Sequence, residues 1–260
     1  MVTKRLDELG DRMKRYERQE TDQTFCPNTW LYVRIDGRGF SKFTKGLKRP
    51  YDERLSNLMV KTTEYLVSET NARVGYTQSD EMSLLIYNGY GNDSAIFDGK
   101  KQKLVSIIAG LTSSYFNRHL PNYIPEKMDY GRLPVFDCRI FSVPSEVEAM
   151  NAIYWRELDC VKNSISMAAH DNFSHKELHK KNSKDMKDML LNCKGVSWDE
   201  YPEFFKYGTY VKRVKYFKDT DNGPVERNRI DSSTTTLSSF REDTVKKVEF
   251  VTSKFLTEEV

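Results

Sequence analysis

Three carboxylates stand where predicted strands end, and they are the side chains of this chain best suited to catalysis. Asp36 closes the strand-like run 30–36 and is followed by Gly37, whereas Asp80 and Glu81 lie at the predicted tip of a hairpin. Carboxylates gathered at one sheet edge repel one another unless a cation joins them. Mg²⁺ suits such a site because it prefers oxygen ligands and substrate phosphates. Two such ions about 4 Å apart activate an attacking hydroxyl and stabilise a leaving phosphate.

Each carboxylate motif also has an ordinary structural interpretation. An Asp-Gly pair is a common turn, and Ser79-Asp80-Glu81 is an unremarkable polar hairpin tip. Their occurrence together, in this order, favours chemistry. Gly37 and Gly39 add to that interpretation because glycine lets the backbone approach a ligand closely.

Basic residues follow the same turn: Lys42, Lys45, Lys48 and Arg49. Near a metal site they are suited to hold triphosphate oxygens, although a solvated loop is the better explanation of any single lysine. Further along, His175 and His179 are spaced like two metal ligands on a helix, but the zinc-protease pattern requires Glu where Lys176 stands. A solvated or RNA-facing basic helix over 176–187 is therefore the prediction. Four lysines recur there at helical spacing: Lys176, Lys180, Lys181 and Lys184.

The order of the elements is what would bring the carboxylates together. Hydrophobic periodicity predicts strands over 30–36, 73–77, 82–87 and 134–143, and helices over 50–69 and 98–117. The order β-α-β-β-α-β is the split unit of ferredoxin-like folds. In that unit the first strand lies beside the hairpin, so Asp36 can meet Asp80. The predicted class is α+β, with added helices and a small C-terminal extension.

The second half of the chain is less regular. Ser145 and Glu148 form a capping-box pattern that begins a helix running toward His170. A strand is predicted over 210–217, a mobile polar loop over 219–239 and a helix over 241–256. The domain prediction is a catalytic core with an N-terminal helix over 1–145, and an RNA-contacting extension over 146–260 packed on the same domain.

Composition is compatible with a cytosolic protein. The 260 residues are 38% hydrophobic and 30% charged, with a formal net charge of +3, which leaves room for local basic patches. No apolar run of membrane-spanning length appears. The four cysteines form no CxxC pair, so reduced thiols and a cytoplasmic location are expected.

Several motifs resemble the histidine-tRNA guanylyltransferase family. The run 33–40 (VRIDGRGF) is similar to its first metal motif and 76–81 (YTQSDE) to its second. Supportive matches are 49–52 (RPYD), 136–139 (FDCR), 155–160 (WRELDC) and 207–209 (YGT). The similarity covers roughly residues 6–217 in consistent order.

The resemblance implies a polymerase-like palm in which Asp36, Asp80 and the Gly37 carbonyl hold two Mg²⁺ ions. It also implies ATP and GTP as substrates, nucleotide addition at the 5′ end of tRNA, and a homotetramer. The residues matched to catalysis are Asp36, Asp80 and Glu81. Those matched to nucleotide binding are Arg34, Gly37, Arg38, Gly39, Phe40, Ser41, Lys48, Arg49, Asp52 and Ser79. RNA contacts are expected from Arg139, Arg156, Asn163, Lys176, Lys180, Lys181 and Lys184.

One stretch departs from the family pattern. Enzymes specific for histidine tRNA carry His-Ile-Asn-Asn-Leu-Tyr-Asn where this chain has 161–167 (VKNSISM), so only Asn163 is kept. Ser41 also stands where the family often has His. These differences resemble the guanylyltransferase-like branch, which repairs 5′-truncated tRNA by templated addition. There are three competing hypotheses: guanylate addition to histidine tRNA, a palm-fold nucleotide cyclase, and a catalytically silent RNA-binding module. The departures at Ser41 and 161–167 argue against the first, the basic region 176–187 against the second, and the intact carboxylates against the third.

Overall fold

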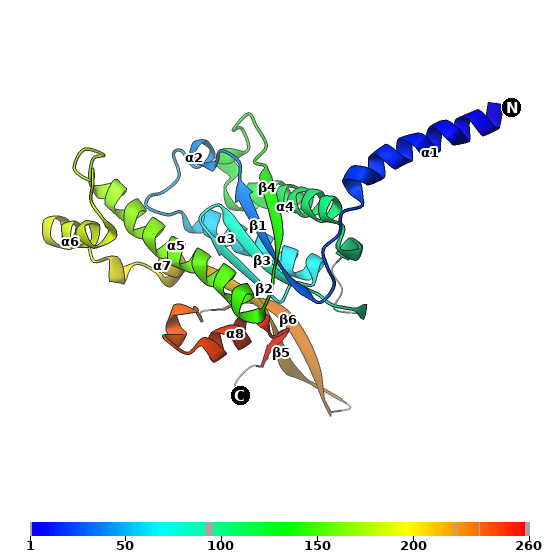
Figure 1. Cartoon of the computed structure of the whole chain (residues 1–260). Coiled ribbons are helices and arrows are strands. Elements are labelled where there is room, and N and C mark those ends of the chain that lie inside the picture. Colours follow the sequence, from blue (N-terminus) through cyan, green and yellow to red (C-terminus); the bar gives the residue numbers. More distant parts are fainter. Residues whose placement is uncertain (1, 92–95, 222, 234, 258–260) are drawn as a thin grey trace.

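The computed structural model describes residues 2–91, 96–221, 223–233 and 235–257. Within these ranges seven strands form one sheet in the order β4-β1-β3-β2-β5-β6, with β7 paired to β5 (Figure 1). The strands are β1 (Thr29–Gly37), β2 (Val74–Gln78), β3 (Glu81–Asn88), β4 (Phe136–Val143), β5 (Thr209–Thr220), β6 (Gly223–Ser233) and β7 (Phe255–Thr257). The helices are α1 (Val2–Thr21), α2 (Phe40–Phe43), α3 (Glu53–Thr70), α4 (Lys101–Tyr123), α5 (Glu146–Asn172), α6 (Ser183–Lys194), α7 (Glu203–Tyr207) and α8 (Thr244–Thr252).

The predicted β-α-β-β-α-β core is confirmed. Strands β4, β1, β3 and β2 lie side by side, and all three pairings between them are antiparallel. Helices α3 and α4 form the two crossovers and contact each other. No helix in the described part of the chain is both long and apolar enough to span a lipid bilayer.

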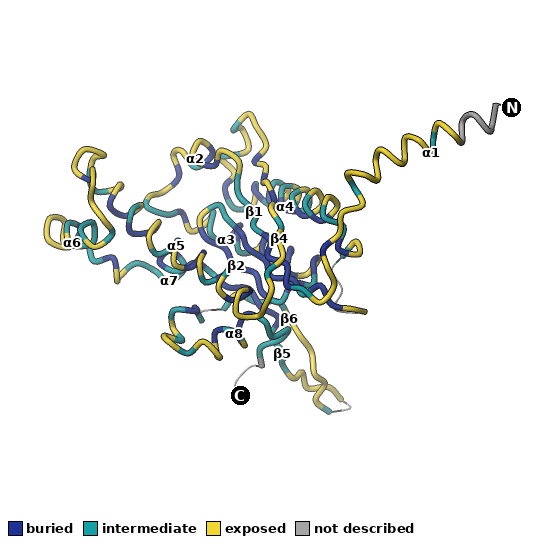
Figure 2. The backbone as a smooth tube through the Cα atoms, in the orientation of Figure 1, coloured by how far each residue is buried: buried dark blue, intermediate teal, exposed yellow. Residues whose placement is uncertain are grey.

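Strand β1 separates two hydrophobic cores because successive side chains of a strand point to opposite faces. Leu31, Val33 and Ile35 are fully buried in the core that α3 and α4 cover. Trp30 and Tyr32 are buried on the opposite face, against residues of α5 and α8. By the same alternation Arg34 and Asp36 point to the α5 side of the sheet. Figure 2 shows this buried centre with exposed segments at its margins.

Helix α5 begins where the capping-box pattern predicts. The Ser145 hydroxyl accepts a hydrogen bond from the backbone N–H of Glu148 at 3.2 Å. Further along α5, the fully buried Glu157 accepts from the Tyr210 hydroxyl at 2.7 Å and from the backbone N–H groups of Leu237 and Ser238 at 2.8 and 2.7 Å. This carboxylate joins α5 to the sheet and to the segment that precedes α8.

The predicted loop over 219–239 is wrong for its central part. Residues 223–233 form β6, which pairs with β5 through eleven residue pairs from Tyr210–Ser233 to Thr220–Gly223. Residues 222 and 234 of that prediction lie outside the described residues. Polar composition misleads here because most of β6 is exposed and needs no apolar face.

Two predicted helices have different bounds. The helix over 241–256 is restricted to α8 (Thr244–Thr252), and Phe255 then pairs in parallel with Arg213 of β5. The basic helix over 176–187 is also wrong in its first half. Residues 175–180 form turns, Lys180 has a left-handed φ of 62°, and Asn182 caps the separate helix α6. Lys176, Lys180, Lys181 and Lys184 therefore do not share one helical face.

Candidate active site

The predicted meeting of the carboxylates occurs at one end of the sheet. The register of β1 and β3 places Asp36 directly opposite Glu81. The N–H of Gly37 donates to the carbonyl of Asp80 at 3.1 Å, which fixes the hairpin tip against the end of β1. Asp36, Asp80 and Glu81 line a common cavity of about 330 Å³.

Electrostatics at this end of the sheet favour a bound cation. Burial raises the pKa of Asp80 above its ordinary value, and the neighbouring charge of Asp36 raises it further. Two carboxylates that repel each other at a cavity wall are relieved by a cation between them. A side chain at Gly37 would collide with the Phe40 ring, so the backbone here requires glycine. The donor set of two carboxylates and a nearby backbone carbonyl fits Mg²⁺.

Glu81 has a different environment from the two aspartates. Its two oxygens accept from Nε and Nη2 of Arg156 at 2.6 and 2.7 Å, and both side chains are largely buried. Arg156 also contacts Asp159 at 3.0 Å. Burial raises the pKa of Glu81, and the Arg156 guanidinium opposes that rise. Within the described residues no group of three or more His, Cys, Asp or Glu side chains is arranged to hold a metal.

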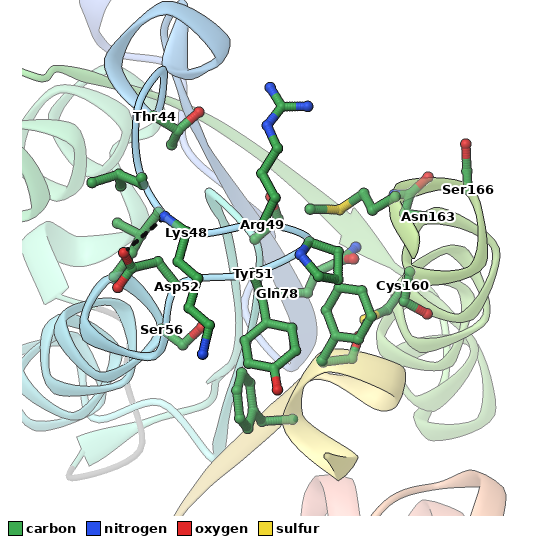
Figure 3. A pocket seen from close by; sticks show the side chains of 18 of the residues that line it. Thr44, Lys48, Arg49, Tyr51, Asp52, Ser56, Gln78, Cys160, Asn163 and Ser166 are labelled. Atoms are coloured by element: carbon green, nitrogen blue, oxygen red, sulfur yellow. Dashed lines mark hydrogen bonds between the residues drawn. The ribbon is translucent and has the colours of Figure 1, made fainter. Parts of the chain in front are cut away.

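A second cavity of about 420 Å³ adjoins the first (Figure 3). The two cavities share one wall, formed by Gln78, Ser79, Asn163, Ser166 and Met167. In Figure 3, the loop that carries Lys48, Arg49 and Tyr51 faces α5 across the second cavity. The pair of cavities therefore extends from the carboxylates to a cationic loop.

Asp52 contributes to this loop as a structural group. It is the N-cap of α3, and its carboxylate accepts from the backbone N–H of Lys48 at 3.2 Å and from the Arg54 guanidinium at 2.8 Å. The hydrogen bond from Arg54 lowers the Asp52 pKa to about 2. Asp52 thus holds the backbone of Lys48 in place beside the cavity.

The remaining predicted nucleotide-binding residues occupy different places. Ser41, Lys48, Arg49 and Ser79 line the second cavity. Arg38 and Gly39 are exposed between β1 and α2. The Phe40 side chain is 2% exposed and packs on Phe43, Phe116 and Phe136, so it belongs to the core. Arg34 lies near the Trp155 ring, 5.8 Å from its centroid.

The predicted RNA-binding residues are not brought together. Asn163 lines both cavities, whereas Arg139 is exposed on β4 and pairs with Asp137 at 3.3 Å. Arg156 is buried with Glu81 and faces the first cavity. The four lysines are exposed on the turns before α6 and at its start, at the far end of α5 (Figure 1).

Sequence patterns missed several cavity residues. Tyr51 packs against Phe204 and Phe205, with ring centroids 5.2 and 4.9 Å apart, and the three side chains form the apolar floor of the second cavity. Ser166 and Met167 lie on the shared wall; they belong to the stretch 161–167 that the sequence singled out, but neither was predicted as a site residue. Tyr51 and Phe205 are far apart in the sequence, so no local spacing signals their contact.

Comparisons with known proteins agree with this fold. The family model described as tRNAHis guanylyltransferase matches residues 10–144. The tRNA(His) guanylyltransferase of Neurospora crassa is 30% identical over 208 residues, which cover 75% of this chain and 70% of that protein. A solved bacterial tRNA(His) guanylyltransferase (Thg1)-like protein in complex with ATP has a TM-score of 0.80 and 34% identity, covering 94% of this chain and 98% of that chain. Another bacterial structure so described, in complex with GTP, has a TM-score of 0.73 and 32% identity, covering 93% and 99%.

Fold, carboxylate-lined cavity and relatives together define a nucleotidyltransferase with a palm-like core. The chain belongs to the tRNAHis guanylyltransferase family, whose model spans more than half of its 260 residues. The resemblance drawn from the two aspartate motifs is confirmed.

Proposed function

We propose that this protein adds nucleotides to the 5′ end of truncated tRNA in the 3′-to-5′ direction, with the opposite strand as template. The observation that carries the proposal is the pair Asp36 and Asp80 in a cavity that continues into a cationic pocket. A reaction between an RNA end and a triphosphate needs two adjoining spaces of this kind. ATP and GTP are the proposed nucleotide substrates, because the two bacterial relatives are described as complexes with them.

Asp36, Asp80 and the Gly37 carbonyl would hold two Mg²⁺ ions. When bound, the ions would activate the attacking hydroxyl and neutralise charge on the leaving phosphate. The protein residues hold the metal-binding aspartates in position. The β1–β3 register and the Gly37–Asp80 hydrogen bond hold the two aspartates at one wall. Arg156 binds Glu81 and so keeps the third carboxylate from adding its charge to that of the pair.

Lys48 and Arg49 are proposed to bind the triphosphate. Both line the second cavity, and Asp52 fixes the backbone of Lys48. Cationic donors beside a metal site stabilise phosphate oxygens through charge-assisted hydrogen bonds. The floor of Tyr51, Phe204 and Phe205 offers apolar surface for a nucleobase.

The preference for repair follows from the shared wall. Asn163, Ser166 and Met167 belong to the stretch 161–167, which departs from the family pattern. This stretch therefore faces the site, and its lack of most of the family's polar groups removes hydrogen bonds that would select one substrate. Base pairing with a template selects the incoming nucleotide without them. An RNA-binding role for Arg139, Asn163 and the four lysines, and assembly as a homotetramer, are parts of the same proposal.

One assay separates this function from its competitors. The protein is incubated with labelled ATP, with unlabelled GTP, CTP and UTP, and with Mg²⁺, in the presence and absence of a tRNA that lacks its first nucleotide. An RNA that gains its missing 5′ nucleotide supports the proposal. A cyclic nucleotide formed without RNA would identify a cyclase, and no product under either condition would leave an RNA-binding module. Asp36→Ala is the control and should give no product.

A further inference from the structure

Among the described residues, no helix covers β4 on the α5 side of the sheet, whereas α5 contacts β1 and β3 there. Strand β4 is the outermost strand on one side, and along it buried residues alternate with exposed ones. Asp137, Arg139 and Phe141 form the exposed row, and the register places them opposite Asp36, Arg34 and Tyr32 of β1. The row therefore lies on the same face as the catalytic carboxylates.

Two large aromatic side chains are exposed on this face. Phe141 is 44% exposed, and its ring lies 5.1 Å from that of Tyr32, between centroids. Trp155 is 49% exposed on the adjacent part of α5. Both residues flank β1, one from β4 and the other from α5. Half-exposed rings supported from one side have apolar surface available for a partner.

Guanidinium groups accompany these rings. Arg156, which is buried and bound to Glu81, supports the Trp155 ring from the protein side at 4.5 Å from its centroid. Arg34 of β1 lies 5.8 Å from the same centroid. Arg139 is exposed beside them on β4. Aromatic rings together with guanidinium groups on an open sheet face are the chemistry with which proteins bind unpaired nucleotides, because bases stack on both.

The surface is continuous with the active site. Arg34 is two residues from Asp36 on β1, which corresponds to about 7 Å along a strand. An RNA whose 5′ end reaches Asp36 and Asp80 brings the end of its paired strand to the same place. If that strand continues as unpaired 3′ nucleotides, they leave the duplex next to Arg34.

We propose that Trp155 and Phe141 form a stacking surface for the unpaired 3′-terminal nucleotides of the RNA substrate. The inference rests on the proposed function for the choice of RNA, and it adds a binding site outside the two cavities. Stacking accepts any base because every base has a π face. The surface would therefore anchor the RNA end without selecting the sequence, in keeping with selection by template pairing.

Intrinsic fluorescence offers a direct test. Trp30 and Trp198 are only 7% and 5% exposed, so Trp155 is the accessible tryptophan. Adding the single-stranded RNA tetranucleotide ACCA should quench the wild-type emission. The quenching should disappear in Trp155→Phe, which removes the fluorophore and keeps an aromatic ring. Undiminished quenching in that variant would place the contact elsewhere and overturn the proposal.

Affinity provides the second readout. A hairpin RNA with a four-nucleotide 3′ overhang should bind wild type more tightly than its blunt counterpart. In Trp155→Ala and in Phe141→Ala the ratio of the two affinities, overhang to blunt, should fall by about tenfold. This is in the range found when a stacking aromatic side chain is removed. Trp155→Tyr should retain most of it. Phe141→Ala is included because Trp155 also contacts Arg156, whereas the ring contact of Phe141 is with Tyr32. The control is Val245→Ala, an exposed apolar residue of α8 that should leave the preference unchanged.

Other outcomes have definite meanings. Equal wild-type affinity for overhang and blunt hairpins would overturn the proposal. So would loss of self-association in Trp155→Ala without any loss of RNA affinity, because the surface would then join two copies of this chain. Neither readout requires catalysis. A protein that adds no nucleotide but shows the Trp155-dependent preference would refute the proposed function and leave this inference standing.

Discussion

At the scale of single residues, the active site holds two carboxylates whose mutual repulsion and burial lower the stability of the folded state. Asp80 is half-buried, and both its burial and the charge of Asp36 raise its pKa. A carboxyl with a raised pKa destabilises the folded state at every pH above that pKa. The cost falls as pH drops through the raised pKa, and it vanishes below the ordinary value of 3.8. A residue that destabilises the folded state in this way is expected where it is kept for its function and not for stability.

Asp80→Asn should therefore separate activity from stability. Nucleotide addition should be lost, because a metal ligand is removed from a phosphoryl-transfer site. In metal-free buffer at pH 7 the melting temperature should rise, by up to about 4 °C for a domain of this size. Most of the gain should disappear near pH 3.5, where Asp80 is mostly protonated in both the folded and the unfolded state. Differential scanning calorimetry at the two pH values measures this.

Asp137→Asn is the matched control for that experiment. Asp137 also lies opposite Asp36, but it is exposed and pairs with Arg139 at the surface. Its replacement should change the melting temperature by less than that of Asp80, because exposed ion pairs contribute little. A melting temperature of Asp80→Asn equal to or below that of wild type at pH 7 would contradict the electrostatic account.

The sequence identified the two aspartates but not the partner of Glu81. Asp36 and Asp80 end neighbouring elements of a recognisable β-α-β-β order, so their meeting follows from topology. Arg156 lies 75 positions from Glu81, and its contact depends on where α5 crosses the sheet. The motif resemblance predicted an RNA contact for Arg156, but a short motif does not show where α5 crosses the sheet, so the contact with Glu81 was not predicted.

At the scale of elements, α5 is tied to the C-terminal half of the sheet by one buried charge. Glu157 is fully buried, and its oxygens accept from Tyr210, Leu237 and Ser238. Each oxygen requires a donor, because an unpaired buried carboxylate would be strongly destabilising. The sequence predicted α5 through its periodicity and cap. Nothing in the pattern distinguished this inward-facing glutamate from the exposed glutamates of the same helix.

Glu157→Gln should destabilise the protein by about 2 kcal/mol. An amide has one acceptor oxygen and would turn its NH₂ group toward donors, so charge-assisted hydrogen bonds are removed and a donor is left facing a donor. Urea denaturation measures the change, and hydrogen exchange should report loss of protection around residues 237–240. The control Glu146→Gln, on the exposed first turn of α5, should change stability by less than about 0.5 kcal/mol. Equal stabilities of the two variants would show that Glu157 is not an anchor.

The β5–β6 hairpin shows why the sequence did not predict strand β6. Its outer strand is mostly polar, and hydrophobic alternation is weak where neither face is buried. The stretch Asp221-Asn222-Gly223 contains an Asn-Gly pair, which is a strong short-range hairpin signal. Weighting that pair above the polar composition would have predicted two strands in place of a loop.

At the scale of the whole molecule, the second cavity reaches the C-terminal end of α5, where the basic segment before α6 begins. His170 lines that cavity, and its ring centroid lies 4.7 Å from that of His175, the residue before Lys176. An RNA that reaches both the cavity and the lysines therefore need not extend along the whole helix. Helical spacing predicted a shared face for Lys176, Lys180, Lys181 and Lys184, and the turns over 175–180 break that face. Their exposure within a short stretch of chain still makes them suitable for binding phosphates.

Replacing these four lysines with Ala should weaken RNA binding and reduce its salt dependence. Each lysine that no longer neutralises a phosphate lowers the slope of log K against log salt by about one unit. Fluorescence anisotropy of labelled tRNA over a range of KCl concentrations gives the slope. The charge-matched control removes four exposed lysines elsewhere: Lys14, Lys103, Lys218 and Lys246. A slope unchanged from wild type, or reduced equally by the control, would exclude the segment before α6 as a specific RNA-binding surface.

Substrate choice tests the assignment of the whole enzyme. We expect repair of a tRNA that lacks its first nucleotide to be preferred over guanylate addition to full-length histidine tRNA. The physical reason is the wall shared by the two cavities. Of the three residues of 161–167 on that wall, only Asn163 keeps the family's side chain: Ser166 is smaller than the family's Tyr, and Met167 cannot donate or accept strong hydrogen bonds. A buried polar group discriminates because the wrong substrate leaves it unpaired, and an apolar group cannot do this. We therefore expect selection to come from pairing with the template, while the protein reads duplex shape and phosphates. A competition with both tRNAs and all four triphosphates gives the ratio, and changing the nucleotide opposite the missing position should change the nucleotide added. Guanylate added to the full-length tRNA in preference, whatever base stands opposite, would show that this chain acts as a histidine-tRNA guanylyltransferase in spite of its altered wall.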